Sequence, residues 1–281
     1  MIYSRKSIIK KTRYKKVVAK GQTVVRKVLI IFIILLFVMG ILAWQSGNEK
    51  VVISEISVSG NEIVKESDIQ ESVRKEMLGK YLWLFRKDNI FIYPKGDIEE
   101  AVFAIDKRIR ALNIHRDSLT SVAVEIFERK PEYVWCESKT ETGEKCFFMD
   151  ELGYIFVEAP QFSGSVFFTF YTPREFNLRN DSDDGVLGNQ LFEISEFEKF
   201  IAFKKEVEKI GFETIGFVEK EENDFELLLT DDSKIIFNEE QNFDDLLENL
   251  DSSIDTIQTS TEPLEYIDLR FGNKVFYKFI D

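Results

Sequence analysis

The stretch VLIIFIILLFVMGILAW, residues 28–44, decides the layout of this chain. Its seventeen residues include no charged, amide or hydroxyl side chain. At ~1.5 Å per residue, a helix of this length just crosses a bilayer hydrocarbon core of ~30 Å. A signal peptide is the competing interpretation, but its apolar region is usually about 7–15 residues long and ends in a small-x-small cleavage site. This run ends in Leu42, Ala43 and Trp44 instead, so we predict a retained transmembrane helix over residues 28–48.

The two flanks of this run differ in charge. Ten of the chain's 37 Lys and Arg residues precede Val28, whereas no Asp or Glu occurs before Glu49. Because cytoplasmic flanks of membrane helices are enriched in Lys and Arg, we expect residues 1–27 to form a basic cytoplasmic tail and the bulk of the chain to lie outside the cytoplasm. A nucleic-acid arm and a contact with anionic lipid are other interpretations of such a tail, and topology determination is the simplest one.

The part of the chain after the run is strongly acidic. It keeps 27 of the 37 basic residues and all 50 acidic ones, so its net charge is −23. This charge argues against nonspecific nucleic-acid binding and suits a domain that stays soluble among extracytoplasmic partners. We therefore expect protein partners, a bilayer contact through residues 28–48, and no nucleic acid.

A domain boundary is predicted at the sequence RKP, residues 129–131. Proline lacks a backbone donor and forces the preceding residue into an extended conformation. The roughly 230 residues that follow the membrane run are enough for two domains. We place these domains at residues 49–130 and 131–281.

The first of these domains follows the order strand, helix, helix, strand, strand. Extended residues from Val51 to Val58 end at a Gly60-Asn61 turn, and Ser67 is a suitable N-cap with Gln70 at the capping-box position. The second helix begins near Lys95. The predicted buried positions are Ile69, Val73 and Met77, then Ile98, Val102 and Ile105, then Ile109, Leu112 and Ile114, then Val122, Val124 and Ile126. Two helices on a three-stranded sheet would bury all four sets.

The second domain is mostly strand-like. Strands are predicted at residues 133–137, 146–150, 154–157, 166–171, 212–218, 225–230, 234–238, 265–271 and 274–280, and helices at 191–209 and 243–254. The 26 Phe residues of the chain are best explained as packing in the core. The sequence thus predicts an α+β protein with one N-terminal transmembrane helix, a βααββ domain, and a β-rich domain with two or three helices.

Two cysteines, Cys136 and Cys146, lie in the part expected outside the cytoplasm, where oxidation is permitted. The turn-prone Thr142 and Gly143 lie between them, so two short strands could bring the thiols together across a hairpin. A disulfide is one outcome and two free thiols the other. Its loop would be too short to contribute much stability.

The usual catalytic motifs are missing from the sequence. It has one histidine, His115, and no Gly-rich phosphate loop, GxSxG, HExxH or CxxC motif. Metal cages and catalytic triads therefore have little to build on. We expect no catalytic residue, no cofactor and no metal ion.

A sortase-like transpeptidase is the strongest enzyme alternative, because those enzymes are anchored, exported and largely β, with His, Cys and Arg in that order. His115, either cysteine and Arg270 follow this order. However, neither YVWC nor GEKC, the sequences that end at the two cysteines, matches the Thr-Leu-x-Thr-Cys strand of sortases. His115 also lies in an extended stretch, where a surface histidine is ordinary.

The segment NDSDDG, residues 180–185, resembles the start of a calcium loop. Aligning Gly185 with the EF-hand glycine puts Ser182 at the third position and Leu191 at the twelfth, where a bidentate Glu belongs. We therefore predict a solvated acidic loop rather than a metal site.

Four stretches resemble those of one bacterial family. ISEISVSGN at 53–61 is similar to its opening strand and Val-x-Gly-Asn turn, and EIFERKPEYVW at 125–135 to its Glu-Arg-x-Pro-x-Ala-x-Trp junction. MDELGYIF at 149–156 resembles its Asp-x-x-Gly-x-Val-Phe hairpin, and YIDLRF at 266–271 its Val-Asp-Leu-Arg-Tyr strand. With the basic tail and the membrane run, the arrangement resembles the cell-division family FtsQ/DivIB, whose first exterior module is a POTRA domain.

This resemblance implies recruitment rather than catalysis. Family members lie in the cytoplasmic membrane at the division septum, bind FtsB/FtsL-type bitopic proteins and link early division proteins to septal peptidoglycan synthesis. Outer-membrane assembly factors also contain POTRA domains, but residues 131–281 leave no room for a membrane barrel.

The predicted partner site is the strand at residues 274–280. No later segment covers it, so we expect its outer backbone groups to lie at a sheet edge, where a partner can add a strand. The resemblance implies the same place, since the family's partner pairs beside the terminal strand. The predicted site residues are Arg270, Phe271, Asn273, Val275, Tyr277 and Phe279. The alternative is that Phe271 and Phe279 are core aromatics of an unused strand.

Overall fold

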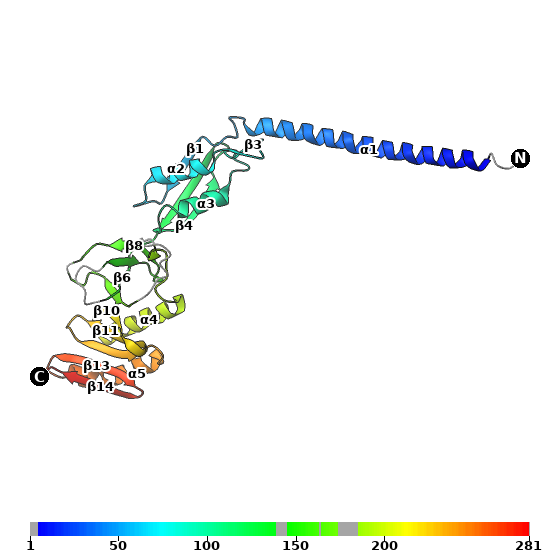
Figure 1. Ribbon diagram of the computed structural model, residues 1–281. Coiled ribbons are helices and arrows are strands. Elements are labelled where there is room, and N and C mark those ends of the chain that lie inside the picture. Colours follow the sequence, from blue (N-terminus) through cyan, green and yellow to red (C-terminus); the bar gives the residue numbers. More distant parts are fainter. Residues whose placement is uncertain (1–4, 139–144, 163, 174–184, 281) are drawn as a thin grey trace. The chain divides into compact units, whose positions relative to one another are not determined.

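The computed structural model describes residues 5–138, 145–162, 164–173 and 185–280. The chain divides into two compact units (Figure 1). The first contains residues 1–105 and 112–126, and the second residues 106–111 and 127–281. Each unit is described here by itself.

The chain begins with the long helix α1, Arg5–Ser46. Its segment Val25–Ser46, 22 residues, is long and apolar enough to cross a membrane. The helix ends two residues before the predicted limit of residue 48, and that prediction is corrected. The cause is local, since the Ser46 hydroxyl donates to the Ala43 carbonyl at 2.8 Å and the Asn48 side chain accepts from the Lys50 amide at 3.0 Å. Such side-chain bonds compete with continuation of the helix.

The globular part of the first unit is a three-stranded sheet with two helices. In chain order its elements are β1 (Glu55–Ser59), α2 (Glu66–Glu76), β2 (Lys80–Tyr81), β3 (Phe85–Arg86), α3 (Lys95–Phe103), β4 (Ile109–Arg116) and β5 (Ser121–Glu128). The sheet order is β1-β5-β4, with β1 parallel to β5. The buried side chains of the two helices and of β5 are Ile69, Val73, Ile98, Val102, Val122, Val124 and Ile126. Period-two and helical apolar spacing located all of these positions.

Three details of this unit differ from the sequence prediction. Ser67 does not cap α2, because the helix begins at Glu66 after an extended Lys65, and the Ser67 hydroxyl donates to Asp68. Gln70 makes no capping box; its amide donates to the Ile56 carbonyl at 3.1 Å and so ties α2 to β1. In addition, Ile105 lies beyond the end of α3 rather than on its apolar face. The short β2–β3 hairpin was not predicted.

The second unit is built on one nine-stranded sheet. Its strands are β6 (Tyr133–Cys136), β7 (Cys146–Met149), β8 (Ile155–Ala159), β9 (Phe168–Tyr171), β10 (Thr214–Glu219), β11 (Asp224–Leu229), β12 (Lys234–Asn238), β13 (Leu264–Phe271) and β14 (Lys274–Phe279). Their order is β14-β13-β12-β11-β10-β9-β6-β7-β8. The helices are α4 (Ile194–Ile210) and α5 (Phe243–Gln258), with a 3₁₀ turn at Glu221–Asn223. All nine predicted strands and both predicted helices of this region are present, with ends shifted by up to four residues.

Phenylalanine rings fill the space between this sheet and its helices. Phe200 of α4 lies 4.7 Å from Phe225 of β11, and Phe203 of α4 lies 4.7 Å from Phe237 of β12, both measured between ring centroids. All four rings are at most 1% exposed. Aromatic pairs of this kind contribute about 0.5–1.5 kcal/mol each beyond their area burial. The core role predicted for the abundant Phe residues is confirmed for the rings between this sheet and its helices, whereas others, such as Phe91 and Phe271, are more than half exposed.

Candidate functional site

Strand β14 is the last strand at one edge of the nine-stranded sheet. It pairs antiparallel with β13, and among the described residues no strand lies on its other side. The Ile280 amide donates to the Pro263 carbonyl at 2.9 Å, so the backbone of Ile280 faces β13. Because successive residues of a strand face opposite ways, the backbone groups of Phe276 and Lys278 also face β13. Those of the three intervening residues, Val275, Tyr277 and Phe279, therefore form the outer row.

The side chains of these three residues lie on the same face of the sheet. Val275 packs against the main core and is half-buried, Phe279 is half-buried, and Tyr277 is 39% exposed. Tyr277 and Phe279 touch through their rings, with centroids 5.6 Å apart. The residues predicted from the sequence thus combine an outward backbone with an apolar side-chain row.

A second aromatic pair lies at the hairpin end of the same two strands. Phe271 is 55% exposed and Phe276 is 50% exposed, and their rings meet edge to face at 5.0 Å. Phe276 was not among the predicted residues. The sequence could have indicated it, because Phe276 lies between Val275 and Tyr277 in a strand. Strand alternation therefore places its ring on the opposite face of the sheet. Two exposed Phe residues in contact are an unusual surface feature that a binding partner could cover.

Arg270 is held in a network of carboxylates. It donates to Asp268 through Nε at 2.9 Å and Nη2 at 2.6 Å, and to Asp224 of β11 through Nη1 at 2.6 Å. These hydrogen bonds, first those to Asp268 and then those to Asp224, raise the pKa of Arg270. Asp268 is buried, so the pair fixes the end of β13 on the sheet. In this arrangement the guanidinium supports the edge, and its Cζ atom lies 5.8 Å from the centroid of the Phe271 ring.

Asn273 lies in the exposed turn between β13 and β14. The preceding Gly272 has φ +64°, a left-handed conformation that glycine adopts without strain. The side chain of Asn249 in α5 donates to the Gly272 carbonyl at 3.0 Å. This bond attaches the turn to α5, so the edge hairpin is held at its tip as well as along β13.

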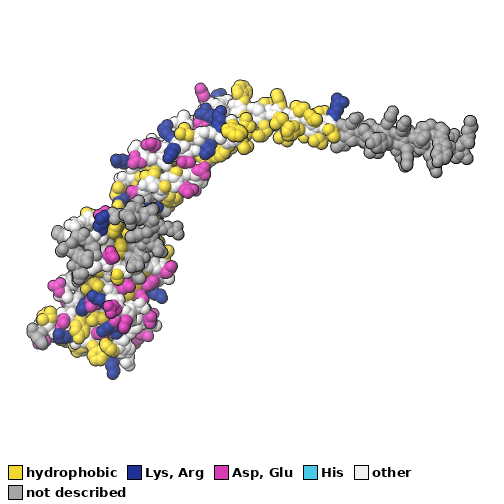
Figure 2. Space-filling view, viewed as in Figure 1, with side chains coloured by type: hydrophobic (Ala, Val, Ile, Leu, Met, Phe, Trp, Pro, Cys, Tyr) yellow, Lys and Arg dark blue, Asp and Glu magenta, His cyan; other side chains and the backbone are white. Residues whose placement is uncertain are grey.

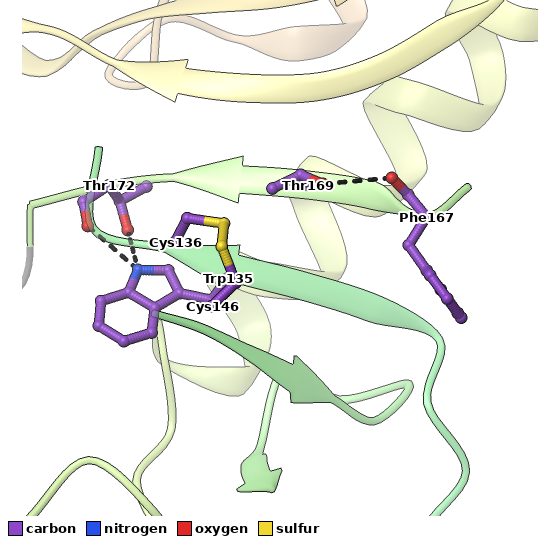
Figure 3. The surroundings of a disulfide bond; sticks show 6 residues. All are labelled: Trp135, Cys136, Cys146, Phe167, Thr169 and Thr172. Carbon is purple, nitrogen blue, oxygen red and sulfur yellow. Dashed lines mark hydrogen bonds between the residues drawn. A yellow bond between two sulfur atoms is a disulfide. The ribbon is translucent and has the colours of Figure 1, made fainter. Parts of the chain in front are cut away.

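The two cysteines lie directly opposite each other on β6 and β7 and are joined by a disulfide (Figure 3). Their Cα atoms are 4.4 Å apart. Beside them the Trp135 indole donates to the carbonyl and the hydroxyl of Thr172, at 3.1 and 3.0 Å. The bond therefore fastens a hairpin that is already paired and anchored by a buried Trp.

His115 lies on the exposed face of β4. Within the described part of the chain, no three His, Cys, Asp or Glu residues are placed to hold a metal ion. The calcium-like segment 180–185 lies largely outside the described residues. An open pocket of about 330 Å³ beside α4 is lined mostly by charged residues of both signs, including Glu198 and Lys205. The C-terminal edge is therefore the best candidate site.

No model of a known protein family matches the chain, and no curated protein matches it.

Proposed function

We propose that this protein is a non-catalytic, single-pass membrane scaffold of the bacterial division machinery, which binds a partner through β14. The observation that carries the proposal is the open edge of the nine-stranded sheet, with the outer backbone row of Val275, Tyr277 and Phe279. An unpaired strand edge invites pairing with another chain, and native proteins usually cover or charge it. Here it is flanked by exposed aromatics instead.

Strand addition explains how such an edge would bind. The partner's backbone would pair with the outer N–H and C=O groups of β14, which supplies affinity without regard to sequence. Specificity would come from side chains on alternate positions, with Tyr277 and Phe279 on one face and Phe271 with Phe276 on the other. Arg270 would contribute by fixing the edge through Asp268 and Asp224.

The remainder of the chain supports a membrane role of this kind. The apolar segment of α1 would anchor the protein with residues 1–27 in the cytoplasm, and the globular part of the first unit and the whole second unit would lie outside it. The order strand, helix, helix, strand, strand in the first unit is compatible with the POTRA module that the sequence resemblance implies. The partners would be bitopic FtsB/FtsL-type proteins, and the site of action the cytoplasmic membrane at the division septum.

Copurification of the full-length chain with its FtsB/FtsL-type partners tests the docking edge. Phe271→Glu adds a charge to the exposed aromatic pair, and Tyr277→Pro removes a donor from the outer row. Both variants should fold, because neither change touches the pairing with β13, and both should lose the partner. Ile194→Glu changes an equally exposed apolar residue on α4 and should retain it. If both edge variants keep the wild-type melting temperature and still capture the partner, β14 is not the docking edge.

The sortase-like alternative is tested by a separate substitution set. A cysteine nucleophile acts as a free thiolate, whereas the sulfurs of Cys136 and Cys146 are bonded to each other, which favours the scaffold. A chain with His115→Ala, Cys136→Ala and Cys146→Ala should still support division when the native protein is depleted. Loss of function in that variant, with the protein folded and present at the membrane, would favour an enzyme.

A further inference from the structure

The small β2–β3 hairpin of the first unit exposes three large apolar side chains in a row. Leu82 is 76% exposed, Trp83 is 91% exposed and Leu84 is 48% exposed. The strands on either side are two residues long and pair Lys80 with Arg86. These exposed side chains gain nothing from burial within the unit. The stability of the unit therefore does not explain why the tip carries apolar residues.

The backbone conformation of the tip is also unfavourable for the large apolar residues that occupy it. Leu82 has φ +49° and Trp83 has φ +60°, and the Leu84 amide donates to the Tyr81 carbonyl at 2.9 Å. Two successive left-handed residues form the kind of hairpin turn that Asn and Gly occupy at little cost. Bulky apolar residues are strained there. The turn therefore holds a Leu and a Trp outward in a fixed conformation, against both backbone and solvation preferences.

Hydrogen bonds tie the base of this hairpin to the end of α1. The Arg86 amide donates to the Ser46 hydroxyl at 3.5 Å, and the buried Asn89 side chain donates to the Ser46 carbonyl at 2.9 Å. Figure 1 accordingly shows β3 beside the C-terminal end of α1. Since a strand advances ~3.3 Å per residue, Trp83 lies within roughly 10 Å of that end along the hairpin.

The end of α1 is also where the apolar segment stops. A helix of 22 residues spans about 33 Å, close to the thickness of a hydrocarbon core. Ser46 would then lie near the boundary between acyl chains and headgroups, with the 82% exposed Trp44 in the interfacial zone that Trp favours. A hairpin fastened to Ser46 starts at the same depth.

We propose that the tip of the β2–β3 hairpin inserts into the outer headgroup and acyl boundary of the membrane that α1 crosses. The inference rests on the membrane anchoring in the proposed function. Leu82, Trp83 and Leu84 supply the apolar and aromatic contact typical of interfacial segments. At the base, Lys80 and Lys87 supply positive charge for lipid phosphates, with Lys87 3.9 Å from Asp97, while Arg86 is paired with Asp88.

Such a contact gives the first unit a second attachment to the bilayer. A hairpin inserted beside α1 opposes tilting of the unit away from the bilayer, because that motion would withdraw Trp83 from the interface.

Tryptophan fluorescence of the full-length chain in vesicles containing brominated lipid tests the insertion. The chain has three Trp residues, and Trp135 is 3% exposed in the second unit. Trp44→Phe reports Trp83 above the Trp135 background, Trp83→Phe reports Trp44, and the double variant reports Trp135 alone. We expect Trp83 to be quenched about as strongly as Trp44 and several-fold more than Trp135.

The two membrane claims fail separately in this design. If Trp44 is quenched and Trp83 is not, α1 is inserted, the hairpin proposal is overturned, and the tip is left for a protein partner. If Trp44 is not quenched, the anchoring proposal fails. If Trp83 is quenched while Trp44 is not, the insertion of the hairpin is still supported. If neither Trp is quenched, both the anchoring proposal and the hairpin proposal are overturned.

A matched pair of substitutions confirms that the quenching comes from an inserted tip. In the Trp44→Phe chain, Leu82→Glu should reduce the quenching of Trp83 several-fold. Leu119→Glu changes an exposed Leu between β4 and β5 and should leave it unchanged. Equal quenching in both variants would contradict insertion of the hairpin.

Discussion

The two edge strands of the nine-stranded sheet, β8 and β14, differ in what pairs with their outer backbone groups. At the β8 edge another segment pairs with the start of the strand: the Ile155 amide donates to the Asn189 carbonyl at 2.9 Å, and the Gly188 amide donates to the Ile155 carbonyl at 2.8 Å. At the β14 edge, no described segment pairs with the outer row, and aromatic side chains are exposed instead. An open strand edge is a liability unless it is covered or paired, and this difference between the two edges is what motivates the proposed docking at β14.

The turn that leads into β8 shows how strongly the covered edge is built. Asp150 is fully buried, pairs with Arg129, and accepts the amides of Leu152 and Tyr154 at 3.0 Å each. The Arg129 guanidinium also lies over the Tyr154 ring, 3.7 Å from its centroid. The two sequence motifs at 125–135 and 149–156 therefore meet in one buried, fully bonded group.

The largest predicted effect is at this covered edge. Asp150→Ala leaves the half-buried charge of Arg129 without its partner and two backbone donors without an acceptor. Breaking a buried ion pair in this way costs about 3–5 kcal/mol. Chemical denaturation of the full-length protein should show this loss in the transition of the second unit. Glu151→Ala removes an exposed pair with Arg110 and should cost less than about 1 kcal/mol. Equal losses in both variants would show that the Asp150 group is not a structural centre.

A proline pair on β14 measures the open edge by the same method. Lys278→Pro removes an amide that faces β13, and an unsatisfied partner carbonyl costs about 1–3 kcal/mol. Tyr277→Pro removes an amide of the outer row. It should cost only a small fraction of the free energy lost in Lys278→Pro, because edge strands tolerate proline where the N–H faces solvent. The reverse ranking would mean that the outer row has been assigned to the wrong residues.

The contrast between the edges also shows what the sequence could predict. Apolar periodicity located the strands, both helices of the second unit and the buried faces of α2, α3 and β5, because burial on one face is a local signal. The site residues on β13 and β14 were chosen from the expected sheet edge and the family resemblance rather than from periodicity, and they stay a prediction. The self-covering of β8 by residues 188–190 was missed, since those hydrogen bonds join segments more than thirty residues apart and leave no periodic trace.

Features that depend on tertiary contacts were not predicted, for the same reason. The Arg270–Asp224 pair links β13 to β11 over 46 residues, so no spacing rule indicates it. Gln70 was predicted to serve a capping box, but a carbonyl of β1 outcompeted that local role. The β2–β3 hairpin was missed because its turn uses Leu and Trp where turn chemistry leads one to look for Asn and Gly.

The smallest predicted effect lies between the two edges, where Glu208 joins α4 to β10. Its Oε1 accepts from Lys204 at 2.7 Å and from Thr214 at 2.6 Å. Burial by itself raises the pKa of the Glu208 carboxyl, but the hydrogen bonds from Lys204 and Thr214 outweigh it, so the net pKa lies below the ordinary value. A depressed carboxyl pKa stabilises the fold above the ordinary pKa of Glu, 4.5, and this contribution is lost as the pH falls through the lower folded-state value.

Glu208→Gln should therefore lower stability at neutral pH and approach the wild type in acid. The measurement is the melting temperature of both proteins, taken from neutral pH down to pH values below the ordinary pKa of Glu. Lys204→Met should remove part of the same pH dependence, since Thr214 still donates. The effect should be smaller than that of Asp150→Ala or Lys278→Pro, because the carboxylate is only half-buried and solvent screens its charge. A difference between wild type and Glu208→Gln that stays constant with pH would mean that the side chain acts by packing and not by charge.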